Sequence, residues 1–575
     1  MDSSPSTSSG AVRKKPRVSI ACTNCRAQHL RCDAKMPKCS RCTFLEKKCV
    51  YKDLRRTKTA ACRSSVLDEV AEAIPLSSTI TLEPVTTFPL TPASVTLQQS
   101  TSNSMPLQPL SQPETLSSTP NRLLDSFYSW FFPAHPFVLP RSRFESYCQK
   151  DPGAIASLKS AMELIGSHYE HRVLDKSSRL ALEQCLSKRL APSVFQVQAL
   201  MLYALILEWS GDCPDAEQIL SKSKSMALDM GLHWRMFTDK HGRGDSVLQE
   251  SMRRTWYELY ILDSLFAGIR HLPTFELHSV DFDVDLPCEE SDYTSLTIPT
   301  PRSLAEYDNR EFEYGETTFS SYTYLIDGAR ILGTCLAAGD VAGKNPLDLV
   351  KNAEANVMSW HLHLPASKRD PVQQNNFVDE VLFRGHLMIQ TVATHLHRPR
   401  SVLEYSTMEL LCSRYAPPLP AEVLSREERQ SDRHTSKAIL AAKAFVDLLS
   451  VPAPPISHSP FVMCMGSLAM ATHLSACEYM LKGHEYAHAK DRVRVFLGIL
   501  KAFEGIWPQA TKWSSEVKFM AKAVFEVKDS QGLPSRSSQT VGNISMDILD
   551  KDRVEDLNVY FDTTATESTE SYPPI

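Results

Sequence analysis

Six cysteines are concentrated in residues 21–50, and their regular spacing is the strongest chemical signal in the chain. They are separated by two, six, six, two and six residues, so a CxxC pair with a third cysteine is followed by the same unit again. The six are Cys22, Cys25, Cys32, Cys39, Cys42 and Cys49. Cysteine thiolates are soft metal ligands, and tetrahedral thiolate sites favour zinc. The pattern therefore predicts a structural zinc site.

The number of thiolates limits how zinc can be bound. A structural zinc ion takes four ligands, so six thiolates are too many for one ion and too few for two separate ions. Two ions fit if two cysteines bridge both metals. The alternative is a single-zinc knuckle with spare thiols, in which His29 or Cys62 would supply a ligand. A disulfide framework is disfavoured, because the first twenty residues hold no apolar run of a secretory signal and intracellular thiols stay reduced.

The cysteine pattern resembles the fungal binuclear zinc cluster DNA-binding domain, which reads C-x2-C-x6-C, a loop with a proline, and C-x2-C-x6-C again. Here Pro37 stands in the corresponding loop, residues 33–38. The resemblance implies two zinc ions per chain, with Cys22 and Cys39 bridging them. It also implies the pairs that complete the two tetrahedra: Cys25 with Cys32, and Cys42 with Cys49.

Short helices are expected at Thr23–Leu30 and Ser40–Lys47, held by metal bonds because helices of this length are marginal alone. In the resembling family the first helix enters the DNA major groove. The residues that would meet the bases are Arg26, Gln28, His29 and Arg31. His29 stands where the family usually has lysine, so its preference for CGG-like triplets is expected to change. Attraction to DNA is expected from the other basic residues: Lys35, Lys38, Arg41, Lys47, Lys48, Lys52, Arg55 and Arg56.

Charge is distributed very unevenly along the chain. Residues 13–58 hold fifteen Lys and Arg against three acids, a local charge of +12, whereas the whole chain carries −5. A basic head on an acidic body is typical of a polyanion-binding module joined to a body with another role. A short basic run predicts a nuclear-localisation or phosphate-contacting arm, with a solvated tail as the alternative: Arg13, Lys14, Lys15 and Arg17.

Composition divides the chain into six parts. We expect a disordered basic arm (1–20), a binuclear zinc cluster (21–52), a basic linker with a short helix (53–75), a disordered Ser/Thr/Pro tether (76–120), an all-helical regulatory domain (121–527) and an acidic disordered tail (528–575). The short helix, Ser65–Ile74, spans under two heptads, so it predicts at most weak homodimerisation. The tail alternates acidic and apolar residues, which suits binding of transcription coactivators, with a solvated tail as the alternative.

Helical periodicity dominates residues 121–527. An aromatic helix running into a proline-broken turn is expected in Asn121–Tyr147, and loops at Cys288–Glu313 and Ala416–Arg433. Further helices are expected at Ser193–Leu207, Pro214–Met230 with Gly231 as its C-cap, Arg253–Leu265, Thr323–Ala337, Val378–Leu396, Ser436–Ser450, Phe461–Leu481 and Arg492–Phe503. Residues 121–400 resemble the helical middle domain of fungal zinc-cluster regulators through stretches such as RRTWYELYILD and DFDVDLP. That family region is linked to regulation and effector sensing.

Other candidate sites have simpler explanations. Arg253 and Arg254 are expected to brace a helix, and Asp281, Asp283 and Asp285 to lie in a solvated loop rather than bind metal. The nine other cysteines form no CxxC pair and are expected to be mostly small core residues. The sequence predicts no membrane span, because its longest apolar-looking segment, Phe461–Leu481, contains His473 and Glu478 and fits a buried helix better.

The sequence thus predicts a mainly α protein with a small N-terminal zinc cluster of two short helices, a disordered tether and a large all-helical regulatory domain. Its expected function is a nuclear, sequence-specific, zinc-dependent transcription factor for RNA polymerase II genes, and its cluster resembles those of secondary-metabolite gene-cluster regulators. The alternatives are a zinc-stapled protein-interaction scaffold without specific DNA binding, and a helical enzyme with a zinc appendage. The absence of P-loop, GxGxxG, HExxH and GxSxG motifs argues against the enzyme.

Overall fold

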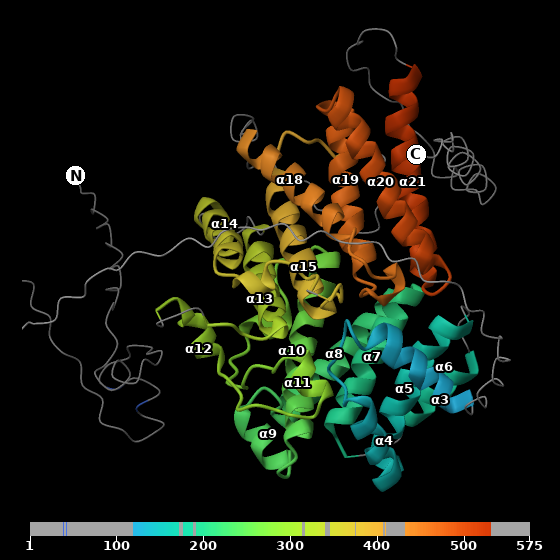
Figure 1. Ribbon diagram of the computed structural model, residues 1–575, viewed down its shortest axis with the longest axis vertical. Helices are drawn as coiled ribbons and strands as arrows, with labels where there is room; N and C mark the ends of the chain where they lie inside the picture. The colour runs from blue at the N-terminus through green and yellow to red at the C-terminus, as the bar shows by residue number, and fades with distance from the viewer. Residues whose placement is uncertain are drawn as a thin grey trace, which may run out of the picture. The chain divides into compact units, whose positions relative to one another are not determined.

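The computed structural model describes residues 119–171, 176–187, 191–312, 317–339, 346–373, 375–405 and 432–530, together with Lys38, Cys42 and Glu409. The chain divides into two compact units, Met1–Pro109 and Leu110–Ile575, and the described helices belong to the second (Figure 1). Four of the predicted features lie outside the described residues: the helices Thr23–Leu30 and Ser65–Ile74, the tether up to residue 118, and the tail beyond residue 530.

The second unit is built from α-helices, with short 3-10 turns and one π-helical turn, η1. The first helices are α3 (Thr119–Ser126), η1 (Phe127–Phe131), α4 (Arg141–Lys150), α5 (Pro152–His171), α6 (Lys176–Ser187), α7 (Val194–Ser210), α8 (Cys213–Met230), α9 (Arg235–His241) and α10 (Ser246–Ile269). The middle ones are η2 (Glu276–Ser279), α11 (Glu290–Thr294), α12 (Leu304–Asp308), η3 (Arg310–Phe312), α13 (Ser321–Gly339), α14 (Pro346–Leu362), η4 (Ala366–Lys368), α15 (Glu380–His397) and η5 (Arg398–Arg400). The last are α18 (Asp432–Leu448), η6 (Pro455–Ser457), α19 (Val462–Tyr479), α20 (Gly483–Glu504) and α21 (Pro508–Ser530).

In the part of the chain that the structure describes, β pairing is limited to one isolated antiparallel bridge between Val372 and Val378. The mainly helical fold class is therefore confirmed for the described part of the second unit, which is called the body below. None of the described helices combines the length and the apolar character that crossing a bilayer requires.

Helix α10 lies at the centre of the body, where it packs against α7, α8, α9 and α13. Its N-terminus is capped by Asp245, whose carboxylate accepts a hydrogen bond from the Leu248 amide at 3.3 Å. The prediction of an amphipathic helix at Arg253–Leu265 needs correction. The helix is longer, and its polar side is buried as well as its apolar stripe, including Glu250 and Glu258. Buried partners for these charges make that possible.

Helices α7 and α8 form an antiparallel pair that closely matches the sequence prediction. Ser193 caps α7, its hydroxyl accepting from the Gln196 amide at 3.3 Å, and 16 of the 17 residues of α7 are buried. Gly211 and Gly231 end the two helices in the left-handed conformation, with φ of 99° and 77°. The predicted glycine C-cap at Gly231 is therefore confirmed.

The later helices form two connected groups. Helix α15 packs on α13 and α14 on one side and on α18 and α19 on the other, and α19, α20 and α21 stand side by side, orange to red in Figure 1. The predicted helices at residues 323–337, 378–396, 436–450 and 461–481 correspond to α13, α15, α18 and α19. The predicted turn after the aromatic helix is also confirmed, since the chain leaves η1 at Phe131 into turns.

The sequence prediction was wrong at four places: one loop, the starts of two helices and the end of the helical domain. The predicted loop Cys288–Glu313 contains α11 and α12, and α12 begins with a capping box between Ser303 and Glu306. Helix α18 begins at Asp432, inside the predicted loop Ala416–Arg433, most of which lies outside the described residues. Helix α20 begins nine residues before the predicted Arg492, and α21 runs past residue 527 to Ser530.

Candidate functional site

The predicted zinc and DNA site lies in the first unit, where the structure describes two residues. Cys42 is 1% exposed and has helical backbone, and Lys38 is exposed at a bend. The other predicted zinc ligands lie outside the described residues: Cys22, Cys25, Cys32, Cys39 and Cys49. So do the remaining predicted DNA-contacting and nuclear-localisation residues: Arg26, Gln28, His29, Arg31, Lys35, Arg41, Lys47, Lys48, Lys52, Arg55, Arg56, Arg13, Lys14, Lys15 and Arg17.

In the body, Arg254 of α10 is fully buried among oxygen acceptors and an aromatic face. Its guanidinium donates to the Glu250 carboxylate at 2.8 Å, to Glu290 at 2.6 Å and to the Cys288 carbonyl at 2.9 Å, and it lies 4.0 Å from the centre of the Tyr293 ring. Burial raises the pKa of the Glu250 carboxyl, but the adjacent arginines outweigh it and the pKa is lowered overall. Arg254 therefore ties α10 to the segment leading into α11, as the predicted helix brace requires.

A second buried charge cluster lies one turn further along α10, around Glu258. Its carboxylate accepts hydrogen bonds from Tyr322 on α13 at 2.5 Å, from Arg384 on α15 at 2.8 Å and from His135 Nδ1 at 2.7 Å. His135 Nε2 in turn lies 2.9 Å from the Ser459 hydroxyl, just before α19. The Glu258 carboxylate therefore joins three helices, α10, α13 and α15, to the turn after η1, and His135 extends the cluster to the segment before α19.

The protonation states in this cluster follow from its geometry. Burial raises the pKa of the Glu258 carboxyl, but Arg384 and the donating hydrogen bonds outweigh it and bring the pKa to about 2. Burial, together with the adjacent Arg384 cation, lowers the pKa of His135 to about 4. Since a carboxylate only accepts hydrogen bonds, neutral His135 carries its proton on Nδ1. These groups fit a bracing role, because each polar atom is directed at a partner within the fold.

An apolar cavity of about 110 Å³ lies among α10, α13, α15, α19 and α21. Its wall includes Leu265, Leu332, Met388 and Trp513, and the stacked rings of His271 and His395 form one side with centroids 5.4 Å apart. A mostly apolar cavity of this size can hold a small apolar molecule. The sequence analysis did not find it, because its lining comes from five helices that are far apart in the chain.

Two further predictions concern isolated residues. Asp281 and Asp283 are exposed in a segment without regular secondary structure, so the solvated-loop interpretation is confirmed for these two. Asp285 lies in the same segment, but its side chain is 17% exposed and forms an ion pair with Arg235 at 2.7 Å. Among the described cysteines outside the cluster, Cys213, Cys335 and Cys477 are buried, and four others are partly buried: Cys148, Cys185, Cys288 and Cys464. The prediction of small core residues is thus correct for three of them.

Comparison with known proteins gives two family matches in chain order. Residues 20–58 match the fungal Zn(2)-Cys(6) binuclear cluster domain, and residues 124–391 match the fungal specific transcription factor domain. The second match covers α4 to α14 and most of α15, and ends before α18. These matches confirm the family resemblance of both regions and imply that the first region binds zinc.

Two relatives extend this comparison. The chain is 28% identical over 573 residues to the C6 finger domain transcription factor iacK of Pestalotiopsis fici, covering 91% of this chain and 83% of that protein. It is 48% identical over 49 residues to the aspyridones cluster regulator of Neocamarosporium betae, covering 8% of this chain and 12% of that protein. No solved structure matches the chain.

Proposed function

Because the chain belongs to the fungal zinc-cluster transcription factors, which bind DNA and are not enzymes, we propose that it controls the genes of a secondary-metabolite biosynthetic cluster. The observation that carries the proposal is the similarity of this chain, at 48% identity over 49 residues, to a protein named as a regulator of the aspyridones cluster. The relative that aligns over 91% of the chain is also named as a transcription factor, which supports the same role for this chain.

The zinc centre is proposed to hold two ions within residues 21–52. Cys22 and Cys39 would bridge the ions, and the other four thiolates would complete the two tetrahedra: Cys25, Cys32, Cys42 and Cys49. The burial of Cys42 supports this arrangement, since a thiolate that binds a metal ion inside a small folded domain is shielded from water. Six thiolates outweigh four metal charges, so the positive potential of the head would come from its lysines and arginines.

DNA recognition is proposed to separate into two kinds of contact. Arg26, Gln28, His29 and Arg31 would read base edges in the major groove, where His29 and Gln28 would move the preference away from CGG-like triplets. The basic residues from Lys35 to Arg56 would bind phosphates and set the salt dependence without adding sequence information.

The remaining parts of the chain would support this role. The basic run at residues 13–17 would direct nuclear import, and the tether at residues 76–120 would let the head move independently of the regulatory domain at residues 121–527. The acidic tail, residues 528–575, would bind a transcription coactivator. Ser65–Ile74 is short, so any homodimer it forms would be weak.

The test combines genome-wide occupancy mapping of the tagged protein with transcript measurements, using Cys25→Ser as the control that removes one zinc ligand. We expect occupied sites in the promoters of one set of neighbouring biosynthetic genes, and their loss in the variant. Gel shifts at several salt concentrations then test for the interaction scaffold. A steep salt dependence without preference among DNA sequences would favour the scaffold over specific recognition.

A further inference from the structure

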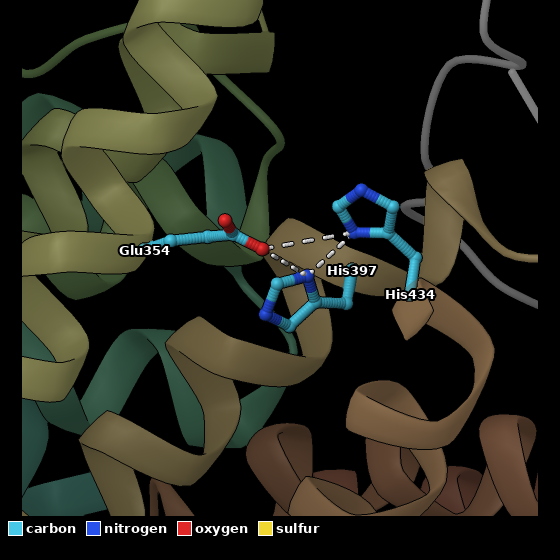
Figure 2. A group of neighbouring side chains, drawn as sticks. All are labelled: Glu354, His397 and His434. Carbon is cyan, nitrogen blue, oxygen red and sulfur yellow. Dashed lines mark hydrogen bonds and ion pairs between the residues drawn. The ribbon is translucent and has the colours of Figure 1, made fainter. Parts of the chain in front are cut away.

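Three side chains from different helices converge in the body, far from the zinc cluster in sequence. Glu354 comes from α14, His397 is the last residue of α15, and His434 lies in the first turn of α18, and Figure 2 shows their polar atoms pointing toward one another. His397 Nδ1 lies 2.9 Å from His434 Nδ1, and Glu354 Oε1 lies 3.7 Å and 4.0 Å from these two atoms. The side chains of Glu354, His397 and His434 are 12%, 5% and 19% exposed.

These separations suit a metal ion. The point in the plane of the three atoms that is equidistant from all of them lies about 2.1 Å from each, which is the bond length of zinc to histidine nitrogen and carboxylate oxygen. Two imidazoles and one carboxylate are a common donor set for zinc with one open coordination position. We propose that Glu354, His397 and His434 form a binding site for a divalent transition-metal ion, with zinc as the ion to test first.

The nitrogen pair has one simpler explanation, a hydrogen bond from one Nδ1–H to the other Nδ1. Two imidazoles that both carry their proton on Nε2 would instead face each other with lone pairs, an arrangement that a metal ion stabilises. Ligation requires neutral imidazoles, because each ring nitrogen binds the metal through its lone pair. The hydrogen bond and the metal site differ in the number of ions bound, which can be measured.

The surrounding charges limit the affinity. Lys437 donates to Glu354 Oε1 at 2.9 Å, and Arg433 donates to Glu354 Oε2 at 3.1 Å. Arg400, in η5, also adds positive charge near both histidines. A metal ion must displace Lys437 from the carboxylate oxygen, which is feasible because the Lys437 side chain is 32% exposed and can turn toward solvent. We therefore expect binding in the micromolar range rather than the tight binding of a thiolate cluster.

An ion here would have a definite mechanical effect. It would fasten the first turn of α18 to the middle of α14 and the end of α15, across the stretch of chain between residues 405 and 432. Helix α18 packs against α19, so the ion would couple the helices matched to the family domain to the C-terminal helices. Metal occupancy would thereby stabilise the body without contacting DNA, and the inference does not depend on the proposed function.

The experiment counts ions bound to the full-length chain by equilibrium dialysis in micromolar zinc, followed by elemental analysis. We expect the wild-type chain to bind one more zinc ion than His434→Ala, which removes a partly exposed ligand. His488→Ala is the matched control. It also removes one member of a histidine pair, whose Nε2 atoms lie 3.0 Å apart on the surface of α20, and it should leave the count unchanged. Equal counts for wild type and His434→Ala would overturn the site.

A second variant tests the role of the competing lysine. Lys437→Met removes the cation that pairs with Glu354 and should tighten zinc binding by about tenfold. A site held only by a histidine–histidine hydrogen bond would show no such gain, so an unchanged affinity would contradict the proposal. Gel shifts with zinc-loaded protein should show equal DNA binding for wild type and His434→Ala, which separates this site from the cluster.

Discussion

The substitution Glu258→Gln tests whether one buried carboxylate holds the body together. Glu258 is fully buried and accepts hydrogen bonds from Tyr322, Arg384 and His135. Glutamine keeps the shape but removes the charge, so the Arg384 guanidinium, which is 5% exposed, loses its counter-ion. One carboxylate oxygen, which accepts hydrogen bonds, would also be replaced by an NH₂ group, which donates them, so this NH₂ would meet the donor groups that the carboxylate had paired with.

The expected cost is about 3–5 kcal/mol, the range for removing one partner of a buried ion pair. Urea unfolding of the full-length chain measures it through tryptophan fluorescence, since Trp209, Trp256, Trp360 and Trp507 are almost completely buried in the body and should report its unfolding. The double variant Glu258→Gln/Arg384→Met should recover part of the loss, because it leaves no unpaired buried cation.

The matched control is Asp491→Asn, which breaks an exposed pair with Arg494 on α20 whose side chains are 51% and 64% exposed. Such a pair contributes at most about 0.5 kcal/mol, so the unfolding midpoint should hardly move. If Glu258→Gln shifted stability no more than Asp491→Asn, the assignment of Glu258 as a buried counter-ion would be refuted.

Three further predictions concern pH, a helix cap and base recognition. Burial lowers the pKa of His135 and His473 to about 4, whereas the same side chains in the unfolded chain have a pKa near 6.5. The free energy of unfolding should therefore fall as pH drops from 6.5 to 4, by about 3 kcal/mol for each histidine. Urea midpoints measured across that pH range test this, and a flat profile would contradict it. Gly231→Ala should cost about 1–2 kcal/mol because φ is 77° there, whereas Gly498→Ala, inside α20 with open space around it, should stabilise by up to about 1 kcal/mol; thermal melts of both variants decide the sign. His29→Lys should shift a binding-site selection toward CGG-like triplets, and unchanged selected sites would remove His29 from base reading.

Local signals in the sequence predicted the parts of the fold that are determined locally. Helix α7 combines strong apolar content with a serine N-cap at Ser193, and α8 ends at the glycine C-cap Gly231. Each of these signals acts within a few residues. The capping box of α12 was also readable from Ser303 and Glu306, but it lay in a polar stretch that was interpreted as a loop. The cysteine spacing is equally local, and it identified the zinc-binding family.

Long-range pairings could not be predicted in the same way. Glu258 and Arg384 lie 126 residues apart, so nothing in the sequence around α10 shows that its polar side is buried. The ligands of the proposed metal site are similarly spread over three helices, at Glu354, His397 and His434. No spacing rule links such residues, because only the packing of α14, α15 and α18 brings them together.

The central claim is that six thiolates hold two zinc ions and thereby shape a DNA-binding head. Its most direct test is the zinc content of the purified full-length His434→Ala variant after dialysis into zinc-free buffer, measured by elemental analysis alongside a gel shift. The claim predicts two ions per chain, and specific DNA binding that is lost on strong chelation and restored by zinc. One ion per chain, or specific DNA binding that survives chelation, would contradict it.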